Sequence, residues 1–179
     1  MALMGTLRCL VAVMMFVCAA SAQLETRVSF PPGRPTSENI RNICLHGNAR
    51  PRYPLTDLPN GGHGTVRREA DVIHRTEAWY SQQCCQGDWE KNTRKAVCCA
   101  LHAWKKTMDI LCEEESMIKT QQRSCCQVQG KERRDCFAGK APNPSYLPPS
   151  SPYTGPNVLP QGPAFVPPGT CSTMLQQKN

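Results

Sequence analysis

The chain has 179 residues, with 21 Lys and Arg against 14 Asp and Glu, 12 cysteines and 16 prolines. This length allows one compact domain with tails or two small domains, and it excludes a large multidomain enzyme. Aromatic residues make up only 6% of the sequence and the mean hydropathy is −0.46, which excludes a protein built from apolar membrane spans.

Residues 1–22 have the features of a secretory signal peptide. Arg8 precedes an apolar run from Cys9 to Ala20, and small residues follow it, so we expect cleavage before Gln23. The run is too short to span a membrane. Removal of residues 1–22 leaves 157 residues with ten cysteines. An even number of cysteines in an oxidising compartment favours disulfides, and the protein is therefore predicted to be secreted.

Residues 23–64 form a segment rich in Pro and Gly, with little regular structure expected. It contains the motif Phe30-Pro31-Pro32-Gly33 and the isolated Cys44. A short helix is predicted after Pro35, where Thr36 or Ser37 can cap the first turn.

Residues 65–140 form the predicted folded core. The stretch from Val66 to Phe137 has no proline and holds eight of the ten cysteines that remain after residue 22. A first helix is indicated by apolar residues at helical spacing, namely Val66, Ala70, Ile73 and Tyr80.

A second helix is predicted from about Arg94 to Cys112, and a third from about Glu114 to Cys125. The second has an apolar stripe stepping by four and three residues: Val97, Leu101, Trp104, Met108 and Leu111. The third has Met117, Ile118 and Gln121 on one side. Since no segment alternates with period two, we predict an all-α, disulfide-stapled helical module.

Residues 141–179 form a Pro-rich tail. Ten of the thirty residues from 141 to 170 are proline, and this composition predicts an extended, disordered segment. A second Phe-x-Pro-Pro-Gly motif occurs at residues 165–169, shortly before Cys171.

The cysteines carry the strongest signal in the sequence. Leu, Ile, Val and Phe make up roughly 15% of the residues after position 22, below the level of about 20% at which chains tend towards disorder. Cross-links would supply the missing stability. Neighbouring cysteines cannot comfortably bond to each other, so each doublet must reach two different places. The structural cysteines are Cys44, Cys84, Cys85, Cys98, Cys99, Cys112, Cys125, Cys126, Cys136 and Cys171.

The spacing of Cys112, Cys125, Cys126 and Cys136 resembles the double-disulfide motif of the serum albumin family. More narrowly, the chain resembles the extracellular matrix protein 1 family, whose albumin-like repeats open with Phe-Pro-Pro-Gly and Asn-Ile-Cys. The matching residues are 30–35, 38–44, Leu58-Pro59, Cys84-Cys85, Trp104, 118–120, Cys125-Cys126, Cys136-Phe137 and 141–146. Family members carry several repeats, whereas this chain has one complete copy.

The resemblance implies a disulfide pattern. The second cysteine of each doublet would bond upstream and the first downstream, giving Cys112–Cys126 and Cys125–Cys136. Extension of this pattern gives Cys44–Cys85 and Cys84–Cys99. Cys98 and Cys171 are left either to join each other or to link two chains into a dimer.

Two kinds of chemistry are not expected. Cys98-Cys99-Ala100-Leu101-His102 resembles the active-site sequence of secreted phospholipases A2, but Ala103 stands where that enzyme needs a metal-binding Asp. The ligand pairs typical of structural zinc sites are also missing from the sequence. We therefore expect neither enzymatic activity nor a cofactor or metal.

The excess of basic residues is modest and dispersed. Its simplest interpretation is a solvated surface, and its functional interpretation is salt-dependent attraction to sulfated glycosaminoglycans. The candidate contacts are Arg67, Arg68, Lys131, Arg133 and Arg134. Nucleic acid is not an expected partner of a secreted protein.

The resemblance implies a secreted, matrix-associated adaptor that binds matrix proteins, proteoglycans, secreted proteases or growth factors, with roles in bone formation, skin and angiogenesis. The alternative is an albumin-like carrier of small apolar ligands. A carrier needs an enclosed cavity of about 300 Å³ or more. The apolar stripe of the second helix is just sufficient to close a core, which ranks the carrier second.

Overall fold

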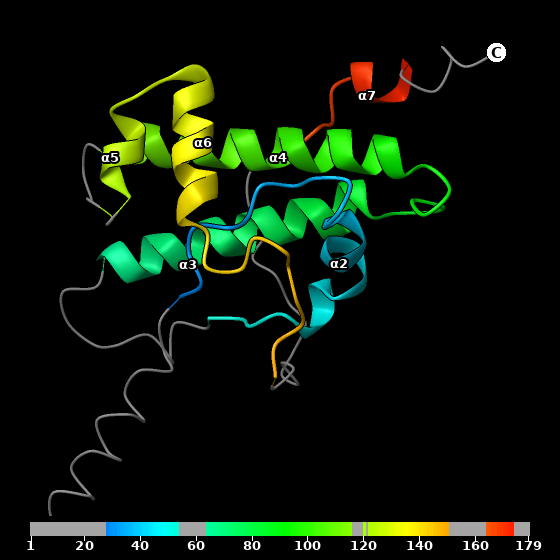
Figure 1. The fold of residues 1–179 in the computed structure, drawn as a ribbon, viewed down its shortest axis with the longest axis horizontal. Coiled ribbons are helices and arrows are strands. Elements are labelled where there is room, and N and C mark those ends of the chain that lie inside the picture. Colours follow the sequence, from blue (N-terminus) through cyan, green and yellow to red (C-terminus); the bar gives the residue numbers. More distant parts are fainter. Residues whose placement is uncertain (1–27, 54–63, 116–119, 121, 151–163, 174–179) are drawn as a thin grey trace, which may run out of the picture.

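A computed structural model describes residues 28–53, 64–115, 120, 122–150 and 164–173. The predicted signal peptide lies outside these residues. The described chain is helical and has no strands, which confirms the all-α fold class (Figure 1). Its helices are α2 (Ile40–Leu45), α3 (Gly64–Trp79), α4 (Thr93–Glu114), α5 (Arg123–Cys126), α6 (Gly130–Lys140) and α7 (Thr170–Thr173), with a 3₁₀ turn at Gly47–Ala49 and a π-helical turn at Tyr80–Cys84.

The long helices α3 and α4 form the centre of the molecule and lie side by side (Figure 1). Both were predicted from apolar spacing. The buried residues of α4 include Trp104, Met108 and Leu111 of the predicted stripe, whereas Val97 and Leu101 are only partly buried. Three alanines complete the buried face of α4: Ala96, Ala100 and Ala103. Small side chains at such positions allow close packing against a neighbouring element.

Polar side chains inside the α3–α4 pair satisfy their hydrogen bonds locally. The hydroxyl of Thr76 donates to the carbonyl of Val72 at 2.8 Å, and that of Thr107 donates to the carbonyl of Ala103 at 2.9 Å. Both threonines are fully buried. Because each hydroxyl has a partner one turn earlier, burial leaves no unpaired donor there.

The N-terminal segment crosses the α3–α4 pair as an extended strap before it enters α2 (Figure 1). The indole Nε1 of Trp104 donates to the carbonyl of Pro32 at 2.9 Å, so the strap is tied to the middle of α4. Phe30 is buried, and Gly33 packs tightly against Pro144 and Tyr146. The predicted helix after Pro35 is present as α2.

The third predicted helix, Glu114–Cys125, is wrong in its extent. Helix α4 continues to Glu114, Thr120 is not helical, and only the four residues of α5 are helical before Gln127. Glu115 instead marks the end of α4. Its buried carboxylate accepts the backbone N–H of Thr120 at 2.9 Å, which fixes the turn that follows the helix. Met117, Ile118 and Gln121 lie outside the described residues.

Helix α6 was not predicted. Phe137 is its one buried residue, and the rest of the helix is polar or partly exposed. A helix of this kind carries no apolar stripe from which it could be recognised. Cys136 anchors it to α5 through a disulfide with Cys125.

The expectation of a disordered Pro-rich tail is wrong for its described parts. Residues 141–150 pack against the core, with Tyr146 buried and its hydroxyl donating to the carbonyl of Gly33 at 2.6 Å. Phe165 is also buried, and its ring stacks on Trp79 with centroids 5.0 Å apart. Residues 151–163 and 174–179 lie outside the described chain. Among the described residues, no helix is long and apolar enough to cross a membrane.

The close approach at Gly33 gives a first prediction. A Cβ there would lie 2.9 Å from Cα of Pro144 and 3.0 Å from Cε2 of Tyr146, and a backbone atom cannot rotate away. We expect Gly33→Ala to lower the free energy of unfolding by about 1–3 kcal/mol in guanidinium titrations of the oxidised protein.

The matched control is Gly139→Ala in α6, where nothing lies within 4 Å of the added Cβ. This substitution should leave stability unchanged or raise it by about 0.5–1 kcal/mol, because alanine favours the helix. Equal losses for the two variants would contradict the packing described.

Candidate functional site

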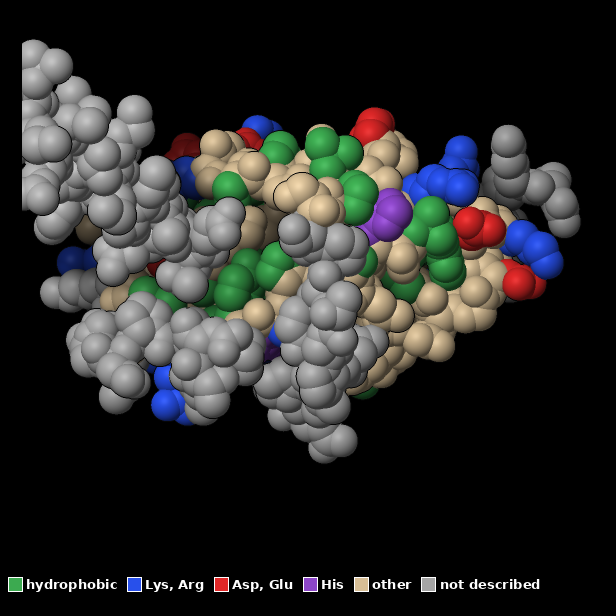
Figure 2. Space-filling model, turned by 90° about the horizontal axis from the view of Figure 1, so that it is seen from below, with side chains coloured by type: hydrophobic (Ala, Val, Ile, Leu, Met, Phe, Trp, Pro, Cys, Tyr) green, Lys and Arg blue, Asp and Glu red, His purple; other side chains and the backbone are tan. Residues whose placement is uncertain are grey.

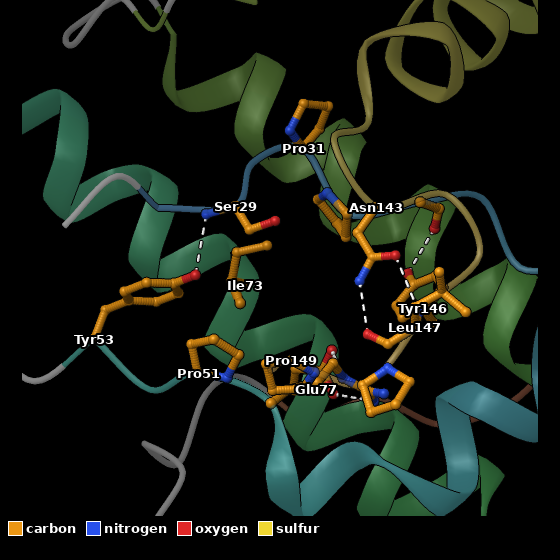
Figure 3. A pocket seen from close by; sticks show the side chains of 14 residues that line it. Ser29, Pro31, Pro51, Tyr53, Ile73, Glu77, Asn143, Tyr146, Leu147 and Pro149 are labelled. Atoms are coloured by element: carbon orange, nitrogen blue, oxygen red, sulfur yellow. Dashed lines mark hydrogen bonds and ion pairs between the residues drawn. The ribbon is translucent and has the colours of Figure 1, made fainter. Parts of the chain in front are cut away.

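A groove lined by prolines lies between the N-terminal strap, the loop after α2, helix α3 and the start of the tail (Figure 3). Its volume is about 260 Å³. The apolar lining comes from Ile73, Leu147 and five prolines: Pro31, Pro32, Pro51, Pro148 and Pro149. Four segments that are distant in the sequence thus form one concave surface.

A buried ion pair forms the charged floor of the groove. Arg50 reaches Glu77 of α3 with two hydrogen bonds, Nε to Oε1 at 2.8 Å and Nη2 to Oε2 at 2.5 Å. The side chains are only 9% and 6% exposed. The guanidinium also donates to the carbonyls of Asn42 and Ile43, at 3.1 and 2.7 Å. These carbonyls lie in the last turn of α2, so Arg50 caps that helix and ties it to α3.

Tyr146 stands against this ion pair. Its ring lies 5.2 Å from the guanidinium carbon of Arg50, within reach of a cation–π interaction. Its backbone has a φ of 52°, in the left-handed region that non-glycine residues rarely adopt. Such a conformation persists where the surroundings hold it, and here the bond from Tyr146 N–H to the carbonyl of Asn143 at 3.2 Å does so.

The phenols beneath the groove are not available for acid–base chemistry. The hydroxyls of Tyr80 and Tyr146 lie 3.4 Å apart, and both residues are buried. Burial raises the pKa of each phenol well above its ordinary value. Both therefore stay protonated at physiological pH.

Tyr53 lines the opposite end of the groove, and His74 contacts Tyr53 without lining the groove. The backbone N–H of Ser29 donates to the Tyr53 hydroxyl at 3.0 Å (Figure 3). The N–H of Tyr53 donates to Nε2 of His74 at 3.1 Å. An imidazole nitrogen that accepts a hydrogen bond is unprotonated. Burial lowers the pKa of His74, Arg52 lowers it further, and Asp71 opposes the shift, so the surroundings of His74 favour the neutral form.

All ten predicted structural cysteines form disulfides. The pairs are Cys44–Cys85, Cys84–Cys99, Cys112–Cys126, Cys125–Cys136 and Cys98–Cys171. The first four follow the pattern that the resemblance implies. For the last pair, the structure favours a bond within the chain over a link between two chains.

The predicted glycosaminoglycan contacts lie on two helices, α3 and α6. Arg67 is exposed, whereas Arg68 pairs with Glu114 at 2.6 Å. On α6, Lys131 pairs with Asp135, and Arg133 pairs with Asp109 at 3.1 Å. Acidic and basic side chains are interspersed on the face shown in Figure 2.

Two further cations, Arg34 and Lys105, lie near the basic residues of α6. Sequence reasoning did not include them among the candidate contacts. Arg34 pairs with Asp135 at 3.4 Å. Burial lowers the pKa of Lys105, and the nearby charges of Arg134 and Arg34 lower it further. The strap, α4 and α6 therefore bring basic side chains to one region. Contacts between such distant segments leave no signal in a single sequence.

One cluster of possible metal ligands occurs among the described residues. Ligand atoms of Cys98, His102 and Cys171 lie within 4.8 Å of one another. Because the two sulfurs are joined in a disulfide, neither is a thiolate that could hold a metal.

The fold and groove define a class of protein: a small helical module of extracellular type, held by five disulfides and built around a rigid concave surface. The chain belongs to the extracellular matrix protein 1 family, because the family model described as Extracellular matrix protein 1 matches residues 19–179. Family membership supports a secreted, extracellular location and a matrix-associated role.

Several relatives carry the same name. The chain is 36% identical over 119 residues to Extracellular matrix protein 1 of Mus musculus and of Rattus norvegicus, and 34% identical over 117 residues to that of Homo sapiens. These matches cover 65–66% of the chain but only 20–21% of each relative, so the chain matches about a fifth of their length. No solved structure matches the chain.

The buried ion pair gives a second prediction. Glu77→Gln leaves the Arg50 cation buried without its carboxylate, and we expect a loss of about 3–5 kcal/mol in the free energy of unfolding. The double variant Arg50→Met/Glu77→Leu should recover most of that loss, because no unpaired charge remains. Denaturant titration measures both.

The control is Asp88→Asn, which breaks the exposed pair of Asp88 with Lys91. It should cost less than about 1 kcal/mol. A loss for Glu77→Gln no larger than this would show that the groove does not depend on its charged floor.

A third prediction concerns pH. The folded-state pKa of His74 lies below the ordinary value of 6.5, so the unfolded chain takes up a proton first as the pH falls. The stability that neutral His74 contributes is complete above about pH 6.5 and is lost as the pH falls towards the folded-state pKa. The unfolding temperature should fall between about pH 7.5 and 5.5.

His74→Gln should show a smaller fall over that range, whereas His46→Gln should behave like the wild type. Identical profiles for the His74 variant and the wild type would contradict the assignment.

Proposed function

We propose that this protein is a non-enzymatic adaptor of the extracellular matrix that binds matrix proteins, proteoglycans, secreted proteases or growth factors. By family resemblance, it would influence bone formation, skin and angiogenesis. Family membership carries the matrix association. The rigid, cross-linked surface supports recognition as the mechanism, since preorganised surfaces lose little conformational entropy on binding.

The chemistry of the groove supports a non-enzymatic role. Arg50 and Glu77 are engaged with each other and with α2, and the phenols of Tyr80 and Tyr146 are held protonated. His74 already accepts a backbone hydrogen bond. Groups that hold the fold together in this way are poorly placed to exchange protons with a substrate.

Basic side chains on the surface support proteoglycan binding. The cations around α6 include Arg34, Lys105, Lys131, Arg133 and Arg134, and the carboxylates among them are Asp109, Glu132 and Asp135. The cations outnumber the carboxylates, so the region attracts sulfate groups. Such attraction between exposed charges weakens as salt is added.

A carrier of small apolar ligands is the second candidate, and the groove is the observation that favours it. Its volume of about 260 Å³ lies just below the lower end of typical ligand sites, about 300 Å³. Titration with a fatty acid, followed by Trp fluorescence, separates the two functions. Saturable micromolar binding favours the carrier, and no binding favours the adaptor.

A fourth prediction tests the proposed binding to proteoglycans. The secreted protein should bind chondroitin sulfate or heparin beads and cell-derived matrix at low salt, and salt should release it. Arg67→Gln/Lys131→Gln/Arg134→Gln should weaken binding to the beads several-fold, because three exposed or partly exposed charges are lost.

The matched control is Lys91→Gln/Arg94→Gln/Lys95→Gln, which removes the same charge from exposed residues at the start of α4. It should weaken binding much less. Equal losses would mean that only net charge matters, and binding that ignores salt would contradict the electrostatic mechanism.

A further inference from the structure

The Cys98–Cys171 disulfide lies beside an imidazole. Cys98 and His102 are one turn apart on α4, and both sulfurs and a ring nitrogen of His102 lie within 4.8 Å of one another. This is the one group of its kind in the described chain. An imidazole this close can give a proton, directly or through one water molecule, to a thiolate that leaves the disulfide.

The two halves of this disulfide differ in exposure. Cys171 is only 1% exposed, whereas Cys98 is partly exposed. A hollow of about 270 Å³ borders the Cys171 side, and its lining includes both Lys95 and Asp88. A thiol from solvent would therefore meet the Cys98 sulfur first, with the buried Cys171 sulfur behind it as the leaving group.

We propose that Cys98–Cys171 is a thiol–disulfide exchange site for small thiols, with His102 as the proton donor. The incoming thiolate attacks Sγ of Cys98 and forms a mixed disulfide. The bond between Cys98 and Cys171 breaks, and its electron pair leaves on Sγ of Cys171, which His102 protonates. The incoming thiol loses its proton to solvent, so the step is balanced without another oxidant or reductant.

The exchange would release the tail and leave the helical core cross-linked. Cys171 is the last cysteine of the chain, and its bond is the disulfide that holds residues 164–173. The other four disulfides join α2, α4, α5, α6 and the π-helical turn. Phe165 would lose its covalent anchor, and Trp79, which is 3% exposed beneath it, would become accessible.

The fifth prediction tests this site with glutathione as the probe. The intact oxidised protein is incubated in graded glutathione, quenched with N-ethylmaleimide, and digested without reduction for mass spectrometry of the linked peptides. Cys98–Cys171 should open first, with glutathione on Cys98 and N-ethylmaleimide on Cys171. His102→Gln should slow this opening about tenfold or more. Trp fluorescence should shift to the red as Trp79 is exposed.

The matched control is His46→Gln, which removes a half-buried histidine at the end of α2 and should leave the rate unchanged. Cys84–Cys99 also lines the hollow and serves as an internal comparison. Earlier opening of that bond, simultaneous opening of all five, glutathione on Cys171 or an unchanged rate in His102→Gln would each overturn the proposal.

A second variant keeps the test independent of any folding defect in His102→Gln. Cys98→Ser/Cys171→Ser should be secreted with the other four disulfides intact. It should take up no glutathione over the period in which the wild type is modified. Uptake at the same rate as the wild type would place the exchange elsewhere and overturn the proposal.

Discussion

Cross-linking by adjacent cysteines is the constraint on which the rest of this structure depends. The doublet Cys84-Cys85 ties the end of the α3 segment to α4 and to α2, and the doublet Cys125-Cys126 ties α5 to α6 and to α4. Three of these bonds close loops of 11 to 15 residues, and a loop of about 15 residues is worth about 3 kcal/mol in the chain-entropy model. A chain with few large apolar residues can thereby keep a compact helical core.

The extended segments pack against the helices that these disulfides hold together. The N-terminal strap is fixed by Trp104, the loop after α2 by the pair of Arg50 with Glu77, and the start of the tail by Tyr146. The first two contacts join a segment without regular structure to a helix, and Tyr146 joins the tail to the strap at Gly33. The groove lies where these segments meet, so its shape follows from the same contacts that stabilise the molecule. Rigid display of such a surface supports the proposed adaptor role, because the groove's ionisable groups are occupied in holding it together.

The sequence predicts what depends on local pattern. The apolar repeat of α4 and the spacing of apolar residues in α3 gave both central helices, and the resemblance implied four of the five disulfides. Helix α6 could not be found in this way, because Phe137 is its one buried residue. The groove was also missed, since it depends on contacts between distant residues. Arg50 and Glu77 are 27 positions apart, and Tyr146 and Gly33 are 113 apart. Proline content suggested a disordered tail, but Tyr146 holds residues 141–150 on the core, and Phe165 together with the Cys98–Cys171 disulfide holds residues 164–173.

A disulfide map of the secreted protein tests the central claim most directly. Digestion without reduction, followed by mass spectrometry of the linked peptides, identifies every bond without assuming a fold. The account predicts Cys44 with Cys85, Cys84 with Cys99, Cys112 with Cys126, Cys125 with Cys136, and Cys98 with Cys171 in the same chain. A doublet bonded to other partners, or a bond between two chains at Cys98 or Cys171, would contradict it.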